Sequence, residues 1–140
     1  MRGEVPRFRL EVRDAAEAFA PLLYTEPVMS CIFCKIVDGT IPSAAVYNDD
    51  QSFAFSDINP RAPVHVLVVP REHIGSLSEA VDGHRALLGH LLWVAAEIAR
   101  QKGLGNGYRV VINNGEDGGQ TVDHLHLHVL GGRAMHWPPG

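Results

Sequence analysis

Three histidines alternate with apolar residues near the C-terminus, at His124, His126 and His128. Strict alternation predicts a β-strand over residues 122–130. Alternate side chains of a strand share one face, so we expect the three imidazoles on one surface and the intervening apolar side chains in a core. An imidazole can act as nucleophile, acid, base or metal ligand near neutral pH.

The spacing of these histidines indicates a division of roles. His124 and His128 would lie roughly 13 Å apart along such a strand. Zinc–nitrogen bonds measure only about 2.0–2.1 Å, so one ion can hardly bind both outer rings. We therefore expect His126 and His128 to serve one anionic centre and His124 to serve something else. A plain metal site on the strand and a purely structural role are the alternatives that remain open.

A glycine-rich segment, GEDGGQT at residues 115–121, directly precedes the histidines. Glycines allow backbone N–H groups to approach a ligand closely, and successive N–H groups can form an anion nest. Thr121 adds a hydroxyl group. The alternative is an ordinary hairpin turn, but beside two convergent histidines we favour a phosphate cradle.

Composition bounds the class of protein. The chain has 140 residues, 46% of them hydrophobic and 20% charged, as expected for one globular domain. A net charge of −4 disfavours nucleic-acid binding. No apolar run approaches the roughly 18 residues of a membrane span. The chain has only two cysteines, which do not make a secreted disulfide scaffold, so we expect a cytoplasmic protein.

The first residues differ from the rest. Residues 1–29 contain five acidic and four basic residues but no histidine or cysteine, and they lack the apolar core of a signal peptide. Either residues 1–28 lie upstream of a natural start at Met29, or they form a genuine extension. We divide the chain into this extension and a domain at 29–140 that ends in a tail at 134–140.

Hydrophobic periodicity predicts five strands and two helices. The strands are expected at 44–48, 52–56, 64–69, 108–113 and 122–130, with a short helical turn at 34–37 and a long helix at 78–102. Short hairpin-like connections favour an α+β fold with a five-stranded antiparallel sheet. Gly39 and Gly103 are expected to end the two helices.

The C-terminal sequence GGQTVDHLHLHVLGGRAMHWPPG resembles the Hint branch of the histidine triad (HIT) family, and the resemblance extends over about residues 31–140. It implies the HIT fold, a homodimer, and hydrolysis or transfer of nucleoside monophosphates at the α-phosphate. It also implies that the tail reaches toward the partner's active site.

The resemblance also implies roles for individual residues. His126 matches the nucleophile, and His128 and His65 match positions that contact the phosphate. Thr121 completes the catalytic group and forms the phosphate loop with Gly119 and Gln120. The remaining nucleotide-binding positions are Asn113, which supports that loop, Asp57 at the ribose, Trp137 in the tail, and an apolar base pocket of Phe33, Ile36, Ile41, Phe55 and Ile58. Simple core packing is the alternative for each pocket residue.

Cys31 and Cys34 form a C-x-x-C pair, which alone is compatible with metal binding, redox chemistry or no special role. In uridylyltransferases and many bacterial Hint-like proteins, such a pair binds zinc with two histidines, which match His73 and His124 here. Two thiolates and two imidazoles make a closed, tetrahedral structural zinc site. Catalysis would need no cofactor.

The activity that this resemblance implies is that of a purine nucleoside phosphoramidase, similar to adenosine 5′-monophosphoramidase. Such an enzyme cleaves the P–N bond of AMP or GMP conjugates through a nucleotidyl-histidine. The alternatives are a dinucleoside polyphosphate hydrolase, a nucleotidyltransferase, and a non-catalytic purine-nucleotide-binding or scaffold protein. We expect no nucleic-acid or membrane partner.

Overall fold

The computed structural model describes residues 30–140, so the predicted extension at 1–28 and the predicted start at Met29 lie outside the described residues. The elements follow in this order: α3 (Ile32–Val37), β1 (Ala45–Asn48), β2 (Ser52–Ser56), β3 (Val64–Pro70), the 3₁₀ turns η1 (Leu77–Glu79) and η2 (Asp82–His84), α4 (Arg85–Gln101), β4 (Tyr108–Val111) and β5 (Leu127–Gly131). No helix in this part of the chain is both long enough and apolar enough to cross a membrane.

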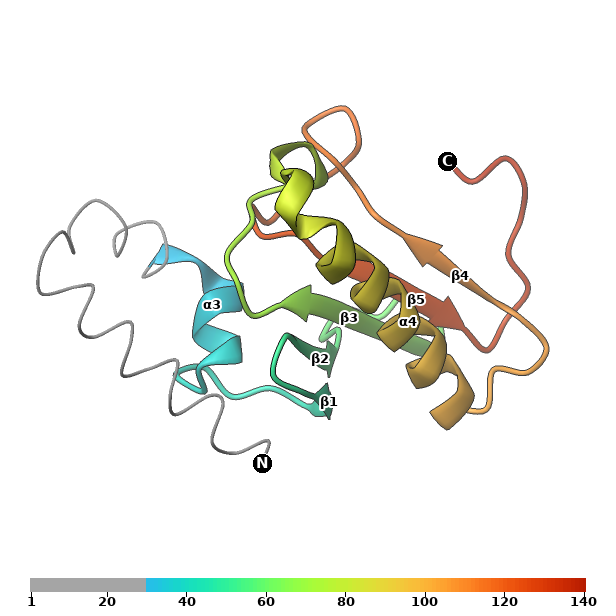
Figure 1. The fold of residues 1–140 in the computed structure, drawn as a ribbon. Helices are drawn as coiled ribbons and strands as arrows, with labels where there is room; N and C mark the ends of the chain where they lie inside the picture. The colour runs from blue at the N-terminus through green and yellow to red at the C-terminus, as the bar shows by residue number, and fades with distance from the viewer. Residues whose placement is uncertain (1–29) are drawn as a thin grey trace, which may run out of the picture.

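The five strands form one antiparallel sheet in the order β1-β2-β3-β5-β4 (Figure 1). The last strand in sequence therefore lies between β3 and β4, and His128 pairs with Leu67 on one side and with Val111 on the other. This arrangement confirms the predicted α+β fold with one long and one short helix.

Each face of the sheet carries its own hydrophobic cluster. Successive side chains of a strand point to opposite faces, and β3 shows this clearly. Val66 and Val68 pack with α4, whereas Leu67 and Val69 pack with α3. His65 shares the face of Leu67 because it lies two residues away on the same strand. His128 shares that face because directly paired residues of antiparallel strands point the same way.

The long helix is shorter than its apolar pattern predicts. It begins at Arg85, and residues 77–84 form two 3₁₀ turns instead of the expected first helical turns. Asp82 and Gly83 are poor helix formers, and the backbone N–H of Val81 donates to the ring of His84. The predicted end is confirmed: Gly103 follows the helix with φ +72°, a conformation that glycine adopts without strain.

The predicted histidine strand is wrong in its first half. β5 begins only at Leu127, so His128 alone of the three histidines lies on a strand. The β3 ladder ends at the pair Val68–Leu127, and the chain after Pro70 turns away from the sheet. The N–H of Leu125 donates instead to Ile74 O at 2.6 Å. The strand predicted at 108–113 likewise ends at Val111, opposite His128. The expected alternation of sides is nevertheless kept: the rings of His124 and His126 contact Phe33 on the α3 side, and His126 contacts His128 there. The intervening residues Leu125, Leu127 and Val129 enter the core under α4.

Candidate active site and metal centre

The sheet brings two of the predicted catalytic histidines together. His65 on β3 and His128 on β5 lie diagonally across the strand pair, with His65 Nε2 and His128 Nδ1 2.9 Å apart. Both rings lie on the face away from α4, and the side chain of His65 is almost wholly buried. Burial lowers the pKa of His65, although the nearby carboxylate of Asp57 opposes that shift. Burial, reinforced by His126 and His65, lowers the pKa of His128 to about 4, so both rings are neutral at pH 7.

The hydrogen bonds fix which nitrogen of each neutral ring carries the proton. The backbone N–H of Arg61 donates to His65 Nδ1 at 3.0 Å, so the proton of His65 must be on Nε2. That Nε2–H donates to His128 Nδ1, which places the proton of His128 on its own Nε2. His128 Nε2 is buried and has no hydrogen-bond partner among the described residues. A buried donor without a partner is costly, so this N–H indicates the position of a ligand acceptor.

His126 is oriented by the backbone of its neighbour. Its Nδ1–H donates to the carbonyl of His124 at 2.7 Å, so Nε2 carries the free lone pair of the neutral ring. His126 is buried, its ring centroid lies 5.1 Å from that of His128, and the ring of Phe33 meets it edge-on at 5.1 Å. A fixed lone pair beside an unpartnered donor is an arrangement suited to nucleophilic attack on a phosphate group.

Asp57 lies at the edge of this histidine cluster. One carboxylate oxygen, Oδ1, accepts from the N–H of Asn59 at 2.9 Å, and the other, Oδ2, is 3.4 Å from His65 Nε2. Potential ligand atoms of Asp57, His65 and His128 all lie within 4.8 Å of one another, as a metal site would require. The N–H of Arg61 on His65 Nδ1 leaves the other nitrogen protonated, however, so hydrogen bonding is the better explanation of this group.

The glycine-rich loop is held by its own residues. The N–H of Gly119 donates to Glu116 O at 3.0 Å and that of Gln120 donates to Gly115 O at 3.0 Å. The predicted anion nest therefore needs correction, because these two N–H groups are already paired within the loop. The side chain of Gln120 acts as a brace: its amide nitrogen donates to Gly75 O at 2.8 Å and to Val122 O at 2.9 Å, and its amide oxygen accepts from Gly115 N at 2.9 Å.

Thr121 and Asn113 lie at the two ends of this region. Thr121 is exposed and lines a hollow together with Cys31 and His73. Asn113 is half-buried and follows the end of β4 by two residues. The hydrogen bond to the segment at η1 is made by the next residue, Asn114, whose side chain accepts from Ser78 N at 2.8 Å.

The predicted base-pocket residues separate into two groups. Phe33, Ile36 and Phe55 are buried in the cluster below α3, and Ile41 packs against it. Ile58 stands apart from them, with 98% of its surface exposed beside Asp57. Trp137 is also outside the core, at 81% exposure. Core packing thus accounts for the three buried residues in this structure, whereas Ile58 and Trp137 are free to contact a ligand.

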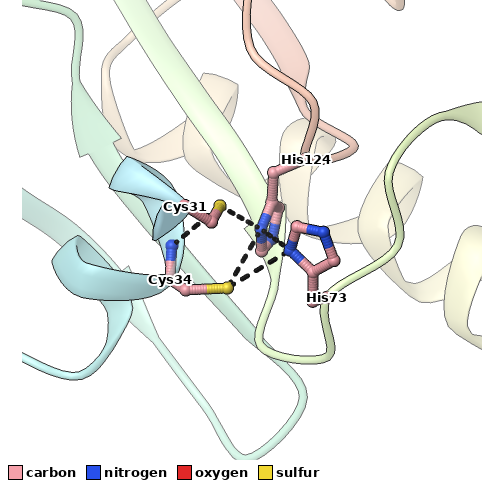
Figure 2. A group of neighbouring side chains, drawn as sticks. All are labelled: Cys31, Cys34, His73 and His124. Atoms are coloured by element: carbon pink, nitrogen blue, oxygen red, sulfur yellow. Dashed lines mark hydrogen bonds between the residues drawn. The ribbon is translucent and has the colours of Figure 1, made fainter. Parts of the chain in front are cut away.

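The two cysteines meet His73 and His124, as Figure 2 shows. The ring of Phe33 contacts both His124 and His126, so this group adjoins the catalytic histidines. Cys31 caps the N-terminus of α3, Cys34 lies in its first turn, His73 follows β3, and His124 precedes β5. His124 Nδ1 lies 3.3 Å from Cys31 Sγ, 3.5 Å from Cys34 Sγ and 3.2 Å from His73 Nδ1. His73 Nδ1 is 3.3 Å from Cys34 Sγ.

These distances fit a tetrahedral zinc ion. Bonds of about 2.3 Å to sulfur and 2.0–2.1 Å to nitrogen give edges of about 3.6 Å between sulfur and nitrogen and about 3.3 Å between nitrogens. The ring of His124 is fixed for this role, because its Nε2–H donates to Pro70 O at 2.9 Å and Nδ1 is left with its lone pair. Burial, with His73 and His126 nearby, lowers the pKa of His124 to about 4, so the ring is neutral as a metal ligand must be. The four residues therefore fit zinc.

Sequence reasoning missed the backbone groups that orient the site. The N–H of Arg61, the carbonyl of His124 and the carbonyl of Gly75 are not visible in residue types, since every residue offers a carbonyl and almost every residue an N–H. It also missed Arg133, whose guanidinium donates two hydrogen bonds to the carbonyl of Arg61.

Comparison with known proteins identifies the family to which this chain belongs. The family model described as HIT domain matches residues 38–135, so the chain belongs to the HIT family. A HIT-like protein of Synechococcus elongatus is 57% identical over 109 residues, covering 78% of this chain and 96% of that protein. A 14 kDa zinc-binding protein of Zea mays is 52% identical over 111 residues, covering 78% and 87%. The crystal structure of a HIT family hydrolase from Legionella pneumophila superposes with a TM-score of 0.78 at 46% identity, covering 79% of this chain and all of that one.

Proposed function

We propose that this protein is a hydrolase that cleaves the P–N bond of purine nucleoside 5′-monophosphoramidates through a nucleotidyl-histidine. The observation that carries the proposal is the pair of fixed tautomers: the lone pair of His126 Nε2 lies beside the unpartnered N–H of His128. The similar protein from Legionella pneumophila is described as a hydrolase, which supports the reaction class.

The reaction divides into two displacements. His126 Nε2 attacks phosphorus, a nitrogen–phosphorus bond forms, and the bond to the substrate amine breaks. The amine leaves with a proton that His128 Nε2–H supplies. Water then attacks the same phosphorus and gives a proton back to His128 Nε2, the bond to His126 breaks, and the nucleoside monophosphate is released. The carbonyl of His124 stabilises the positive charge that His126 acquires while it is phosphorylated.

The nucleotide would extend from this centre toward Asp57. We infer that the carboxylate of Asp57 accepts hydrogen bonds from the ribose hydroxyls and that the exposed side chain of Ile58 covers the purine. Thr121 would contact the phosphate from the loop side, with Gln120 holding the loop in place. Phe33 supports the nucleophile rather than the base, since its ring meets His126 edge-on.

We further propose that Cys31, Cys34, His73 and His124 hold zinc. When bound, zinc would supply structural cross-linking between α3 and the segments that flank the sheet, because all four positions are taken by protein. The maize relative is described as zinc-binding, which supports this assignment. His124 links this centre to the catalytic one, because its ring faces the cysteines while its carbonyl orients His126.

A cytoplasmic homodimer is the assembly that we propose. β4 is an edge strand, and unpaired edges favour association with another strand. Leu92 and Trp93 on α4 and Tyr108 on β4 are between 42% and 52% exposed, so both elements present large apolar side chains that a second subunit could cover. An isologous dimer would bury this surface and bring the tail with Trp137 toward the second site.

The test is turnover of a fluorogenic adenosine 5′-phosphoramidate compared with a diadenosine polyphosphate. We expect a kcat/KM at least tenfold higher for the phosphoramidate, and a covalent nucleotidyl adduct on His126 after rapid acid quench and mass spectrometry. Preference for the polyphosphate would favour the dinucleoside hydrolase, and binding of AMP without turnover of either compound would favour a nucleotide-binding protein. Either result would contradict the proposal.

A further inference from the structure

A chain of hydrogen bonds runs from the exposed side chain of Arg133 to the buried nitrogen of His128. Arg133 donates to the carbonyl of Arg61 through Nη2 at 2.9 Å and Nε at 3.2 Å. The N–H of the same residue, Arg61, donates to His65 Nδ1 at 3.0 Å. His65 Nε2–H then donates to His128 Nδ1 at 2.9 Å. One peptide segment therefore connects a surface guanidinium to the catalytic pair.

This connection selects one of two proton arrangements. Two neutral imidazoles that share one hydrogen bond can carry their protons in either of two ways. In the alternative arrangement, His128 Nδ1–H would donate to His65 Nε2, and His65 would carry its proton on Nδ1. That proton would face the N–H of Arg61 across 3.0 Å, and two donors would oppose each other. Only the first arrangement leaves a proton on His128 Nε2, where the substrate is expected.

The loop that carries Arg61 has one internal side-chain hydrogen bond, from the N–H of Asn59 to Asp57 Oδ1 at 2.9 Å, and it depends on contacts outside itself for the rest of its support. Residues 57–63 contain two prolines, Pro60 and Pro63, which have no N–H to donate. The loop is closed by the N–H of Asp57 on His65 O at 2.9 Å, and Pro63 packs closely on Gly132. Between these anchors, the side chain of Arg133 donates to the carbonyl of Arg61.

We propose that Arg133 is a positioning residue: by holding the carbonyl of Arg61, it keeps the N–H of Arg61 on His65 and so keeps the donor proton on His128 Nε2. The proposal rests on the function proposed above, because it gives that proton its use. Arg133 itself touches neither the catalytic rings nor the site of the phosphate; it acts through the backbone of Arg61.

The experiment compares Arg133→Ala and Arg133→Lys with a matched surface control, Arg100→Ala, which removes an arginine that pairs with Glu97 on α4. The ¹⁵N chemical shifts of the histidine rings report the tautomers in the free protein. In the unmodified protein we expect His65 and His128 both to be protonated on Nε2. In Arg133→Ala we expect shifts that indicate mixed tautomers for both rings, and in Arg100→Ala none.

Kinetics with the phosphoramidate give the second measurement. Loss of the two hydrogen bonds from Arg133 to the carbonyl of Arg61 predicts a kcat roughly fivefold to tenfold lower for Arg133→Ala, with KM changed less than twofold. Arg133→Lys keeps the charge but cannot bring two donors to one carbonyl in the same geometry, so it should recover less than half of the loss.

Two results would overturn the proposal: a normal kcat in Arg133→Ala, or histidine ¹⁵N shifts in Arg133→Ala that equal those of the unmodified protein. The failure of the proposed function is a separate outcome. If the unmodified protein does not turn over the phosphoramidate, the function is wrong, while the tautomer measurement still decides whether Arg133 orders the two rings.

Discussion

The proposed zinc centre is tested most directly by the variant Cys34→Ser. Serine has a similar size but is a poor zinc ligand, so the change removes one of four ligands with little steric effect. The remaining three ligands include His124, which is fully buried. We expect purified Cys34→Ser to contain less than about 0.2 zinc per chain, against about one for the unmodified protein.

The magnitude of the stability loss follows from linkage. Zinc at about a thousand times its dissociation constant stabilises the native state by about 4 kcal/mol. Unfolding entropy of about 2.1 cal/mol/K per residue gives about 0.23 kcal/mol/K for the 111 residues from 30 to 140. The melting temperature should therefore fall by about 10–20 °C, where the lower value allows for zinc binding to the unfolded C-x-x-C pair.

Calorimetry measures the melting temperature and elemental analysis measures the zinc content. The control is the double variant, whose loss of stability should not be the sum of the two single losses. Cys31→Ser should give the same loss, and the double variant no more than either single one, because one ion mediates all the effects. His84→Ala, a half-buried histidine paired with Glu72 outside the cluster, should lower the melting temperature by only a few degrees. Zinc-free protein purified without chelators, or a melting temperature that chelation leaves unchanged, would refute the reasoning.

Four further outcomes are expected. His126→Ala should lower kcat by at least about a thousandfold while AMP affinity, measured calorimetrically, changes little; near-normal turnover would contradict covalent catalysis. Gln120→Ala, which loses three loop hydrogen bonds, should raise KM several-fold and speed amide exchange in residues 115–122, and unchanged exchange would argue against the brace. Trp137→Ala should alter the ratio of kcat/KM between substrates with large and small leaving groups, and an identical ratio would exclude a selective tail. Because the pKa of His128 is lowered from 6.5 to about 4 on folding, the unfolded state binds more protons between these values. The free energy of unfolding of the unmodified protein, measured by urea denaturation, should therefore rise with pH between pH 4 and 6.5 relative to that of His128→Gln. The slope should be at most about 1.4 kcal/mol per pH unit, and less because solvent screens the partly exposed ring. Above pH 6.5 the difference between the two proteins should stay constant.

The periodicity of apolar residues predicted the elements well where local pattern and tertiary contacts agree. β2 lies at the predicted residues, and β1 and β3 differ from prediction by a single residue. The predicted start of the long helix lies too early in the sequence, because the apolar pattern continues through residues whose backbone hydrogen bonds form 3₁₀ turns. Leu92, an apolar residue of this helix, is 51% exposed, since it lies one position past the buried Leu91 and so points about 100° away around the helix.

The types and spacing of the residues by themselves indicated that the histidines have two different roles, because one ion can hardly bind both His124 and His128. They also identified Cys31 and Cys34 as a candidate ligand pair. Whether His73 and His124 would join them was decided by the tertiary structure, which brings three separate segments to one point. The physical reason is that a ligand set depends on distances of a few ångströms between residues up to 93 positions apart in sequence.

The tertiary structure alone decided the proton arrangement of the catalytic centre. The sequence names His65, His126 and His128 as imidazoles, and an isolated imidazole can carry its proton on either nitrogen. The choice is made by the carbonyl of His124 and the N–H of Arg61, two backbone groups that nearly every residue possesses. Residue identity thus determined which rings are present, whereas the path of the backbone determined which nitrogen of each ring carries the proton.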